Sequence, residues 1–233
     1  MTDPSPLWKH LQAIGLVAPA PTALYFADPM CSWCWGFSPV IAGLAERYRD
    51  AISIHCVMGG LRAGNTVPTD GPFREEILHH WQAVRECTGQ PFLFDGALPD
   101  GFVYDTEPAC RAVVTMAELE SARTLGFLRS LQQAFYAEGR DITRSDVLAG
   151  IADQNGVDRD RFLQAFHLPE FQDKTVTHFQ LSRDFGVHGF PTVALVDEQA
   201  ATLLTAGYAS IETLTPRIED WLKRMRDSRI QDA

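Results

Sequence analysis

The chain has 233 residues, of which 45% are hydrophobic and 21% charged, as is usual for a globular protein that can bury a sizeable core. Its formal net charge is −10 and it has no basic cluster, which argues against nucleic acid as a partner. No apolar run approaches the roughly 18 residues that a membrane span requires, so we expect no membrane association.

The first 21 residues favour an irregular arm, because four prolines fall among them, with room for one short helix near Leu7–Ile14. A secretory signal begins with basic residues and continues with about 7–15 unbroken apolar ones. Here Asp3 precedes any basic residue, and polar residues interrupt the apolar part. We therefore expect a cytoplasmic protein.

A β-α-β unit follows the arm. Thr22–Ala27 is a short apolar run between Pro21 and an Asp-Pro pair, which predicts a buried strand. Apolar residues then recur at spacings of three and four as far as Tyr48, which predicts an amphipathic helix. Ala51–Met58 predicts a second strand, ended by two glycines. Two strands joined by one helix favour a parallel pair with a right-handed crossover.

Between Leu61 and Phe185 the strand pattern gives way to helices. Asp105 or Thr106 is the candidate cap of the helix predicted at 107–118, and Thr143 is the candidate cap of the helix predicted at 143–155. The predicted helices cover residues 73–87, 107–118, 121–137, 143–155, 158–167 and 171–185, with a loop at 89–102.

Strands return near the C-terminus. Thr192–Val196 is apolar and β-branched, residues 202–206 can pair with it across a turn, and Ile211–Arg226 predicts a final amphipathic helix. The order β-α-β, helices, β-β-α places both strand-bearing ends in one sheet. We therefore predict an arm over residues 1–21, a discontinuous α/β domain over 22–60 and 186–233, and an inserted helical subdomain over 61–185.

Two of the five cysteines lie close together, in the tetrad Cys31-Ser-Trp-Cys34 between the first strand and its helix. At a helix N-terminus, unpaired backbone N–H groups and the helix dipole favour the thiolate of Cys31. Cys34 lies one turn further into the helix, where it can attack a mixed disulfide on Cys31 and release the partner. The position therefore predicts a redox pair with Cys31 as nucleophile and Cys34 as resolving thiol.

A zinc site and a pair of unreactive buried thiols are weaker interpretations of the tetrad. Zinc needs about four ligands, and the chain has no second CxxC, so we expect no metal site. Two buried apolar thiols remain an alternative, but a CxxC that follows a strand and opens a helix favours redox chemistry. An odd number of scattered cysteines does not indicate a structural disulfide framework, and we expect Cys56, Cys87 and Cys110 to be unreactive thiols.

The segment from Tyr25 to Pro39, YFADPMCSWCWGFSP, resembles the DsbA family of thioredoxin-fold proteins and is most similar to the cytoplasmic, FrnE-like branch with a CxWC motif. Downstream, GVHGFPTV from Gly186 to Val193 resembles that family's cis-proline segment. The resemblance implies a thioredoxin fold with a helical subdomain inserted between the β-α-β and β-β-α halves. It also implies that Pro191 is cis and faces Cys31, and a cis bond would turn the backbone of Phe190 towards a substrate strand.

Two positions depart from better-known relatives and suggest the direction of the reaction. DsbA-like oxidases carry a histidine before the resolving cysteine, where this chain has Trp33, and thioredoxins often carry a carboxylate where it has Tyr25. Without these groups we expect a less acidic Cys31 and a less oxidising disulfide than in DsbA. In a reducing cytosol such a pair rests as the dithiol, which favours a reductase or isomerase.

Neighbouring residues are candidates for supporting roles. Asp28 either caps the helix or takes part in proton transfer, and the cap is the favoured interpretation. His188 either stabilises the thiolate or is a solvated loop histidine. Trp33 is expected to be exposed and, with Phe190 and His188, to bind substrate, whereas Trp35 is expected in the core.

Three functions compete on the sequence alone. The first is a dithiol oxidoreductase that uses a disulfide-containing protein or peptide and a thiol electron donor, needs no cofactor beyond its cysteine pair and has glutathione as a candidate reductant. The second is a glutathione-dependent transferase or isomerase of the kappa-class or 2-hydroxychromene-2-carboxylate isomerase type, whose members usually carry serine in place of Cys31. The third is a binding module, which would not need the resolving thiol. The sequence predicts no particular oligomeric state.

Overall fold

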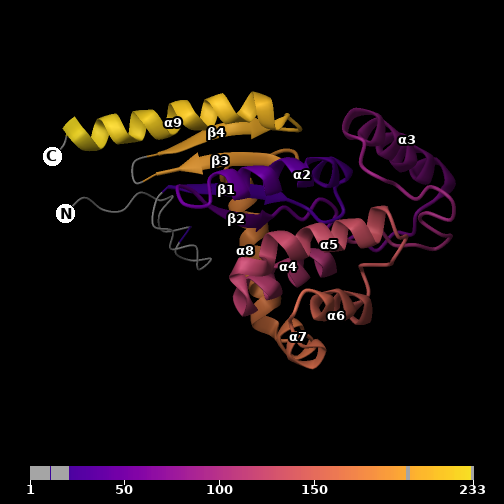
Figure 1. The fold of residues 1–233 in the computed structure, drawn as a ribbon. Coiled ribbons are helices and arrows are strands. Elements are labelled where there is room, and N and C mark those ends of the chain that lie inside the picture. The colour runs from indigo at the N-terminus through magenta and orange to yellow at the C-terminus, as the bar shows by residue number, and fades with distance from the viewer. Residues whose placement is uncertain (1–10, 12–20, 198–199, 232–233) are drawn as a thin grey trace.

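A four-stranded mixed sheet forms the centre of the computed structural model, which describes residues 11, 21–197 and 200–231 (Figure 1). The strand order is β2-β1-β3-β4. Strand β1 pairs in parallel with β2 and antiparallel with β3, and β3 pairs antiparallel with β4. The strands are β1 (Thr22–Ala27), β2 (Ser53–Met58), β3 (Thr192–Val196) and β4 (Ala201–Ala206). The predicted arm falls almost wholly outside the described residues.

Every strand predicted within the described residues is present, and so are the predicted helices, with small shifts at their ends. The long segment predicted at 121–137 is divided into a 3₁₀ helix, Ser121–Arg123, and α5. The helices are α2 (Ser32–Arg47), α3 (Gly71–Thr88), α4 (Glu107–Leu119), α5 (Thr124–Tyr136), α6 (Ser145–Gln154), α7 (Arg159–Phe166), α8 (Pro169–Asp184) and α9 (Ile211–Gln231).

The prediction that Thr143 caps a helix is wrong. The cap position of α6 is Arg144, and the Thr143 hydroxyl instead donates to the Asp141 carboxylate at 2.6 Å. The N-terminus of α4 is held by Asp105 rather than by Thr106, because the Asp105 carboxylate accepts the N–H of Glu107 at 3.0 Å. Local turn bonds of Asp and Thr compete with helix caps, and the sequence alone does not decide between them.

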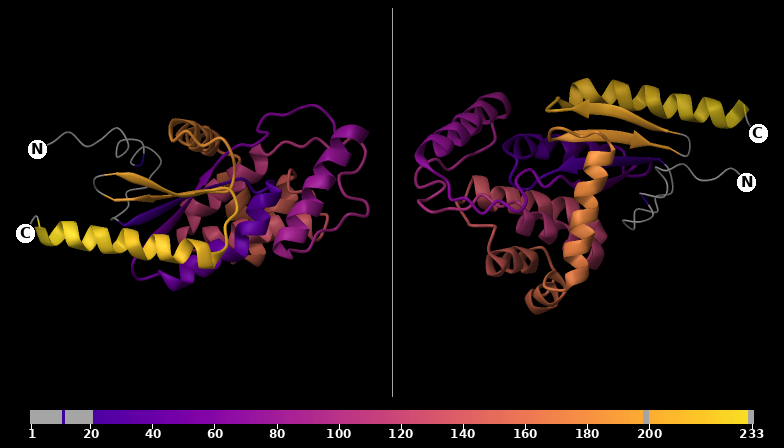
Figure 2. Two further views of the ribbon diagram at one scale, coloured as in Figure 1. Left: turned by 90° about the horizontal axis from the view of Figure 1, so that it is seen from above. Right: turned by 180° about the vertical axis from the view of Figure 1, so that it is seen from behind.

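Helices cover both faces of the sheet. α9 and α8 lie on opposite sides of it, as the view from above shows (Figure 2). α2 packs with α9 on one face, and α8 contacts β2 from the other. Since side chains alternate along a strand, Tyr25 faces the side covered by α2 and α9, and Phe26 faces the side covered by α8.

All the helices from α3 to α8 lie between β2 and β3 in the chain, which agrees with the predicted inserted block, although its boundaries stay a prediction. An aromatic cluster fixes α3 against α5: the rings of Trp81 and Tyr136 are 5.0 Å apart, and Phe92 packs on both. Edge-to-face packing of this kind adds stability beyond buried area. None of the helices in the described residues is long and apolar enough to span a membrane.

Candidate active site

Cys31 and Cys34 lie where β1 gives way to α2. Cys31 occupies the N-cap position of α2, and its side chain makes no capping bond there. The Asp28 carbonyl accepts the N–H of Cys31 at 3.1 Å, which closes the turn between strand and helix. Backbone N–H groups at a helix N-terminus are the groups that stabilise a thiolate in general, and Cys31 rather than Cys34 occupies that position here.

The segment before β3 forms the wall opposite the cysteines. The Phe190–Pro191 peptide bond is cis, as the resemblance implied. The Cys31 Sγ donates to the Phe190 carbonyl at 3.5 Å, although the two residues are 159 positions apart in the chain. The Pro191 carbonyl in turn accepts the N–H of Gly207 at 2.7 Å, which ties this segment to the end of β4. The fold therefore brings the Cys31 thiol onto the backbone of Phe190.

The two thiols differ in accessibility and in proton affinity. Cys31 keeps 8% of its surface exposed, whereas Cys34 has none. Burial raises the pKa of the Cys34 thiol well above its usual value, and the hydrogen bond with Cys31 and the charge of Cys31 raise it further. Tyr25 is also buried, and its pKa is raised first by burial and then by the charge of Cys34. A thiol that keeps a small accessible area beside one that is fully buried is the arrangement that dithiol exchange requires.

The two tryptophans of the tetrad region have different environments. Trp35 is buried, and its indole N–H donates to the Pro91 carbonyl at 3.0 Å, so its predicted place in the core is confirmed. The prediction of an exposed Trp33 needs correction, because this side chain is half-buried: its ring packs against Tyr208, with the ring centroids 6.1 Å apart. Together Trp33 and Tyr208 form an aromatic surface beside Cys31.

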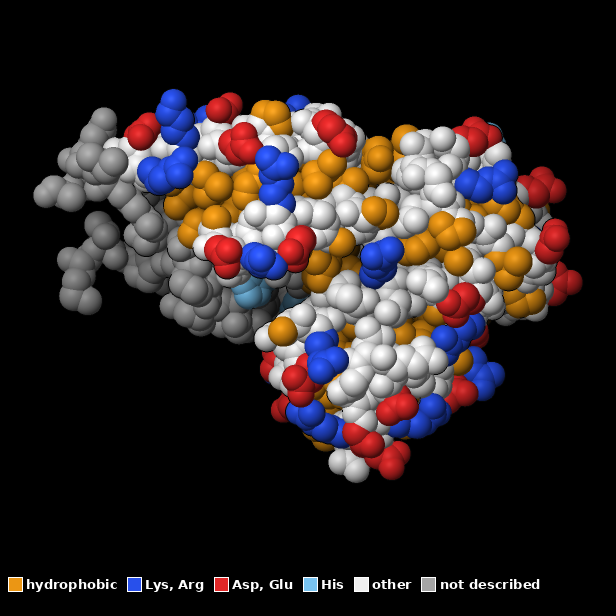
Figure 3. Space-filling view, viewed as in Figure 1, with side chains coloured by type: hydrophobic (Ala, Val, Ile, Leu, Met, Phe, Trp, Pro, Cys, Tyr) orange, Lys and Arg blue, Asp and Glu red, His pale blue; other side chains and the backbone are white. Residues whose placement is uncertain are grey.

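His188 lies on an exposed loop and lines a groove of about 520 Å³ formed with Phe185, Leu203 and the backbone of the 186–190 segment. No hydrogen bond joins His188 to Cys31 in the described part of the chain. The location matches the solvated loop histidine rather than the thiolate partner. On the opposite side of the sheet, Figure 3 shows further hydrophobic side chains gathered over β3 and β4 beneath α9.

Phe190 is held by Gly59 at the end of β2. A Cβ atom at Gly59 would overlap the far edge of the Phe190 ring, so only glycine leaves room for the ring. The N–H of Gly59 donates to the Ala27 carbonyl at 2.8 Å, which fixes this residue beside β1. The close approach therefore sets the position of the Phe190 carbonyl in front of Cys31.

We expect Gly59→Ala to displace the Phe190 ring, to lower the free energy of unfolding by about 1–3 kcal/mol and to slow attack by Cys31. Urea unfolding and the alkylation rate of Cys31 measure the two effects. Gly71→Ala is the matched control, because Gly71 has open space around it and an ordinary φ. Gly64 is unsuitable because its φ is positive. A Gly59→Ala variant as stable and as reactive as Gly71→Ala would contradict the inference that the space beside Gly59 positions the Phe190 ring.

The prediction that Asp28 caps the helix is wrong. Its carboxylate is fully buried and accepts the N–H groups of Met30 at 2.8 Å and Leu61 at 2.7 Å, which links the turn before Cys31 to the loop after β2. Cys110 on α4 donates its thiol to the same carboxylate at 3.4 Å. Tyr104 contacts the same turn before Cys31, since its hydroxyl donates to the Met30 carbonyl at 2.6 Å.

Sequence reasoning missed Cys110 and Tyr104 as neighbours of the site. Their signal is weak, since both come at least 70 residues after the tetrad and neither belongs to a recognisable motif. The one available hint is an acidic residue placed directly after an apolar strand and before the CxxC.

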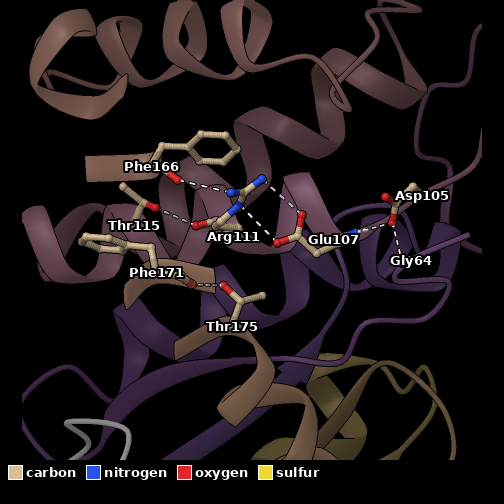
Figure 4. A network of polar contacts seen from close by, with 8 residues as sticks. All are labelled: Gly64, Asp105, Glu107, Arg111, Thr115, Phe166, Phe171 and Thr175. Carbon is tan, nitrogen blue, oxygen red and sulfur yellow. Dashed lines mark hydrogen bonds and ion pairs between the residues drawn. The ribbon is translucent and has the colours of Figure 1, made fainter. Parts of the chain in front are cut away.

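Arg111 follows Cys110 on α4 and bridges two helices (Figure 4). Its guanidinium pairs with Glu107 at 3.1 Å and lies 4.1 Å from the centre of the Phe166 ring. Burial raises the pKa of Glu107, and the Arg111 charge lowers it. These contacts join α4 to α7, and they stabilise the helical block rather than contribute to the cysteine site.

Comparison with known proteins gives a consistent family. The model of the DSBA-like thioredoxin domain matches residues 23–219. A crystal structure described as a "putative protein disulfide isomerase" from Nitrosomonas europaea is 38% identical, with a TM-score of 0.84 over 88% of this chain and 98% of that one. The cytosolic disulfide reductase DsbM from Pseudomonas aeruginosa is 28% identical, with a TM-score of 0.69 over 91% of this chain and 100% of that one.

A curated relative has a different kind of name. The ClpXP adapter protein SpxH from Halalkalibacterium halodurans is 26% identical over 212 residues, which cover 87% of this chain and 68% of that protein. The match to the domain model covers both halves of the sheet, the inserted helices and the cysteine tetrad. The chain therefore belongs to the family of the DSBA-like thioredoxin domain.

Proposed function

We propose that this protein is a thiol–disulfide oxidoreductase that reduces or isomerises disulfides of protein or peptide substrates in the cytoplasm. The observation that carries the proposal is the placement of Cys31 at the start of α2, with its Sγ 3.5 Å from the Phe190 carbonyl and a buried second thiol one turn away. The 28% identity to a cytosolic disulfide reductase supports both the reaction and the compartment.

The reaction follows from the two thiols. The Cys31 thiolate attacks one sulfur of a substrate disulfide, and the other substrate sulfur leaves as a thiolate. Cys34 then attacks Cys31, so that a Cys31–Cys34 disulfide forms and the second substrate sulfur is released. The substrate gains two electrons and the cysteine pair loses them. An external thiol returns the pair to the dithiol, and glutathione is our candidate because DsbM has been solved with GSH.

The surroundings of the pair favour reduction over oxidation. A strong oxidant stabilises its reduced form through a very acidic nucleophile. Trp33 supplies no charge between the cysteines, and burial of Cys34 keeps that thiol protonated. No charged side chain between the two cysteines therefore stabilises the reduced form of the pair. We propose a more reducing potential than that of DsbA.

Equilibration with glutathione redox buffers tests the direction. We expect a potential of about −200 to −270 mV, far below the roughly −120 mV of DsbA. Trp33→His should move the potential towards DsbA, whereas Trp35→Phe, a change in the core, should not. A wild-type potential close to that of DsbA would contradict the reductive direction, and insulin reduction that survives Cys31→Ser would contradict the enzyme itself.

Protein binding without catalysis is a second candidate, favoured by the similarity to SpxH, whose name describes an adapter. An adapter would bind its partner equally well after Cys31→Ser, because binding does not need the nucleophile. The glutathione-dependent isomerase alternative has weaker support: 2-hydroxychromene-2-carboxylate isomerase is 13% identical, with a TM-score of 0.58, and shares the fold alone.

A further inference from the structure

Pro39 interrupts the hydrogen bonds of the active-site helix α2. In a regular helix each N–H donates to the carbonyl four positions before it, so the N–H of residue 39 would serve the Trp35 carbonyl. Proline has no N–H, and its ring also crowds that carbonyl. Because Trp35 is buried and directly follows Cys34, its carbonyl needs a donor from elsewhere in the protein.

Gln90 supplies this donor. Its Nε2 donates to the Trp35 carbonyl at 2.9 Å and to the Ser38 hydroxyl at 3.0 Å. One amide therefore holds the turn of α2 that comes directly before Pro39 at two points. Gln90 comes 55 positions after Trp35 in the chain, so the missing helix bond is replaced by a contact from the helical block.

The chain around Gln90 is fixed against α2 by further contacts. A Cβ atom at Gly36 would lie 2.9 Å from methyl groups of Val84 and Thr88, so the last turn of α3 lies directly on α2. Gly89 then ends α3 with a φ of 72°, and the Thr88 hydroxyl accepts the N–H of Gln90 at 3.3 Å. The end of α3 therefore determines where the Gln90 amide lies.

The backbone of Trp35 connects Gln90 to the cysteine pair. The N–H of Trp35 donates to the Cys31 carbonyl at 3.1 Å, and the N–H of Cys34 donates to the same carbonyl at 3.0 Å. These two bonds fix Cys31 and Cys34 relative to each other across the first turn of α2. The contact with Gln90 is made by the Trp35 carbonyl, so it does not depend on the indole ring.

We infer that Gln90 is a positioning residue for the closure of the Cys31–Cys34 disulfide, acting through the backbone of Trp35. The inference rests on the proposed function and deepens it. Attack of one group on another in the same turn is fast when the two are held close and aligned. The Gln90 amide keeps the first turn of α2 fixed although Pro39 interrupts the helix.

Only the second half of the reaction uses this geometry. In the mixed disulfide, Cys31 Sγ is bonded to a substrate sulfur. The Cys34 sulfur bonds to Cys31 Sγ and is oxidised, and the bond from Cys31 to the substrate sulfur breaks with its electron pair. The substrate sulfur is reduced and leaves as a thiol, with the proton that Cys34 has lost. The first half, attack on the substrate, involves Cys31 alone.

The test measures the two halves separately. Attack by Cys31 is followed with a disulfide-bonded fluorescent peptide in a Cys34→Ser background, and resolution by release of the peptide thiol from the mixed disulfide with Cys34 present. Gln90→Met keeps the length of the side chain but has no N–H. We expect it to slow resolution by about threefold to tenfold, the effect of one hydrogen bond, and to leave attack unchanged. The equilibrium constant for forming the Cys31–Cys34 disulfide in glutathione buffers should fall by a similar factor.

A double-mutant cycle with Pro39→Ala shows whether Gln90 acts through the interrupted helix bond. Alanine at position 39 supplies the missing N–H to the Trp35 carbonyl, and Pro39 is exposed, so its replacement removes little packing. Gln90→Met should therefore slow resolution in the wild type but not in the Pro39→Ala background. Gln133→Met is the matched control, since this exposed glutamine of α5 bonds Glu138 rather than α2.

Equal slowing of attack and resolution in Gln90→Met, the same loss of resolution with and without Pro39, or a resolution rate equal to that of the wild type would overturn the inference. If Gln90→Met does not fold, Gln90→Asn supplies the test, because its shorter side chain withdraws the amide from the Trp35 carbonyl and should slow resolution alone. Failure of wild-type Cys31 to form any mixed disulfide would instead remove the proposed function, and this inference with it.

Discussion

In the Cys34→Ser variant we expect disulfide reduction without added thiol to stop after one substrate molecule per protein, with that substrate held on Cys31. Cys31 keeps its place at the start of α2 and can still attack. The resolving thiol is gone, and serine cannot form the disulfide that releases the substrate. Mass spectrometry of the unreduced protein should show one covalent adduct on the peptide that contains Cys31.

The Cys31→Ser variant should form no adduct and should reduce insulin no faster than dithiothreitol alone. Its remaining thiol, Cys34, has no exposed surface and a raised pKa, so it is neither accessible nor ionised. Both variants are best made together with Cys87→Ser, because Cys87 is an exposed thiol outside the site and replacing it excludes any exchange at a further sulfur. An adduct on Cys34 in Cys31→Ser, or full turnover in Cys34→Ser, would contradict the assigned order of attack.

Much of the fold could be predicted from the sequence because the strong patterns are local. The bounds of β1 and β3 agree with the prediction, since each is an apolar run flanked by proline and turn residues. The tetrad marks the start of α2. Where local preferences compete, as at Thr143 and Thr106, the choice of cap depends on side-chain bonds that the sequence does not reveal.

Only those parts of the site that belong to local motifs could be predicted from the sequence. The cysteine pair and Pro191 are such parts, but the side chains that pack around them come from distant segments. Asp28 meets Cys110, 82 positions away, and Trp33 is partly covered by Tyr208. Both contacts depend on how the inserted helices and β4 return to the sheet, and one sequence does not contain that information in its spacing. For this reason the local pattern wrongly favours a helix cap for Asp28 and an exposed position for Trp33.

Acid should weaken the fold through His178, a buried histidine of α8. Its Nδ1 accepts the N–H of Met58 at 3.2 Å, and Ser182 on the same helix donates to the Met58 carbonyl at 3.5 Å. Together they attach α8 to the end of β2, one residue before the Gly59 that seats Phe190. A protonated Nδ1 could not accept this hydrogen bond, so the anchor needs the neutral ring.

The sign of the effect follows from the pKa of His178, which burial, and to a smaller extent Lys174, lowers to about 4. The unfolded chain takes up this proton near pH 6.5 and the folded chain does not, so the stabilisation is complete above about pH 6.5 and is lost as the pH falls towards 4. At pH 5 the loss from this residue alone is about 2 kcal/mol. Asp28 acts in the opposite direction, because its raised pKa favours protonation of the folded state.

Urea unfolding at pH 7.5 and pH 5 isolates the histidine. His178→Asn keeps an amide oxygen that can accept the Met58 N–H but does not titrate, so the drop in stability between the two pH values should shrink by about 2 kcal/mol relative to the wild type. His80→Asn on α3 is the matched control, since that side chain is 58% exposed and its replacement should leave the drop unchanged. An unchanged drop in His178→Asn would show that the ring is protonated in the folded protein. The anchor between α8 and β2 would then have to depend on Ser182 rather than on the imidazole.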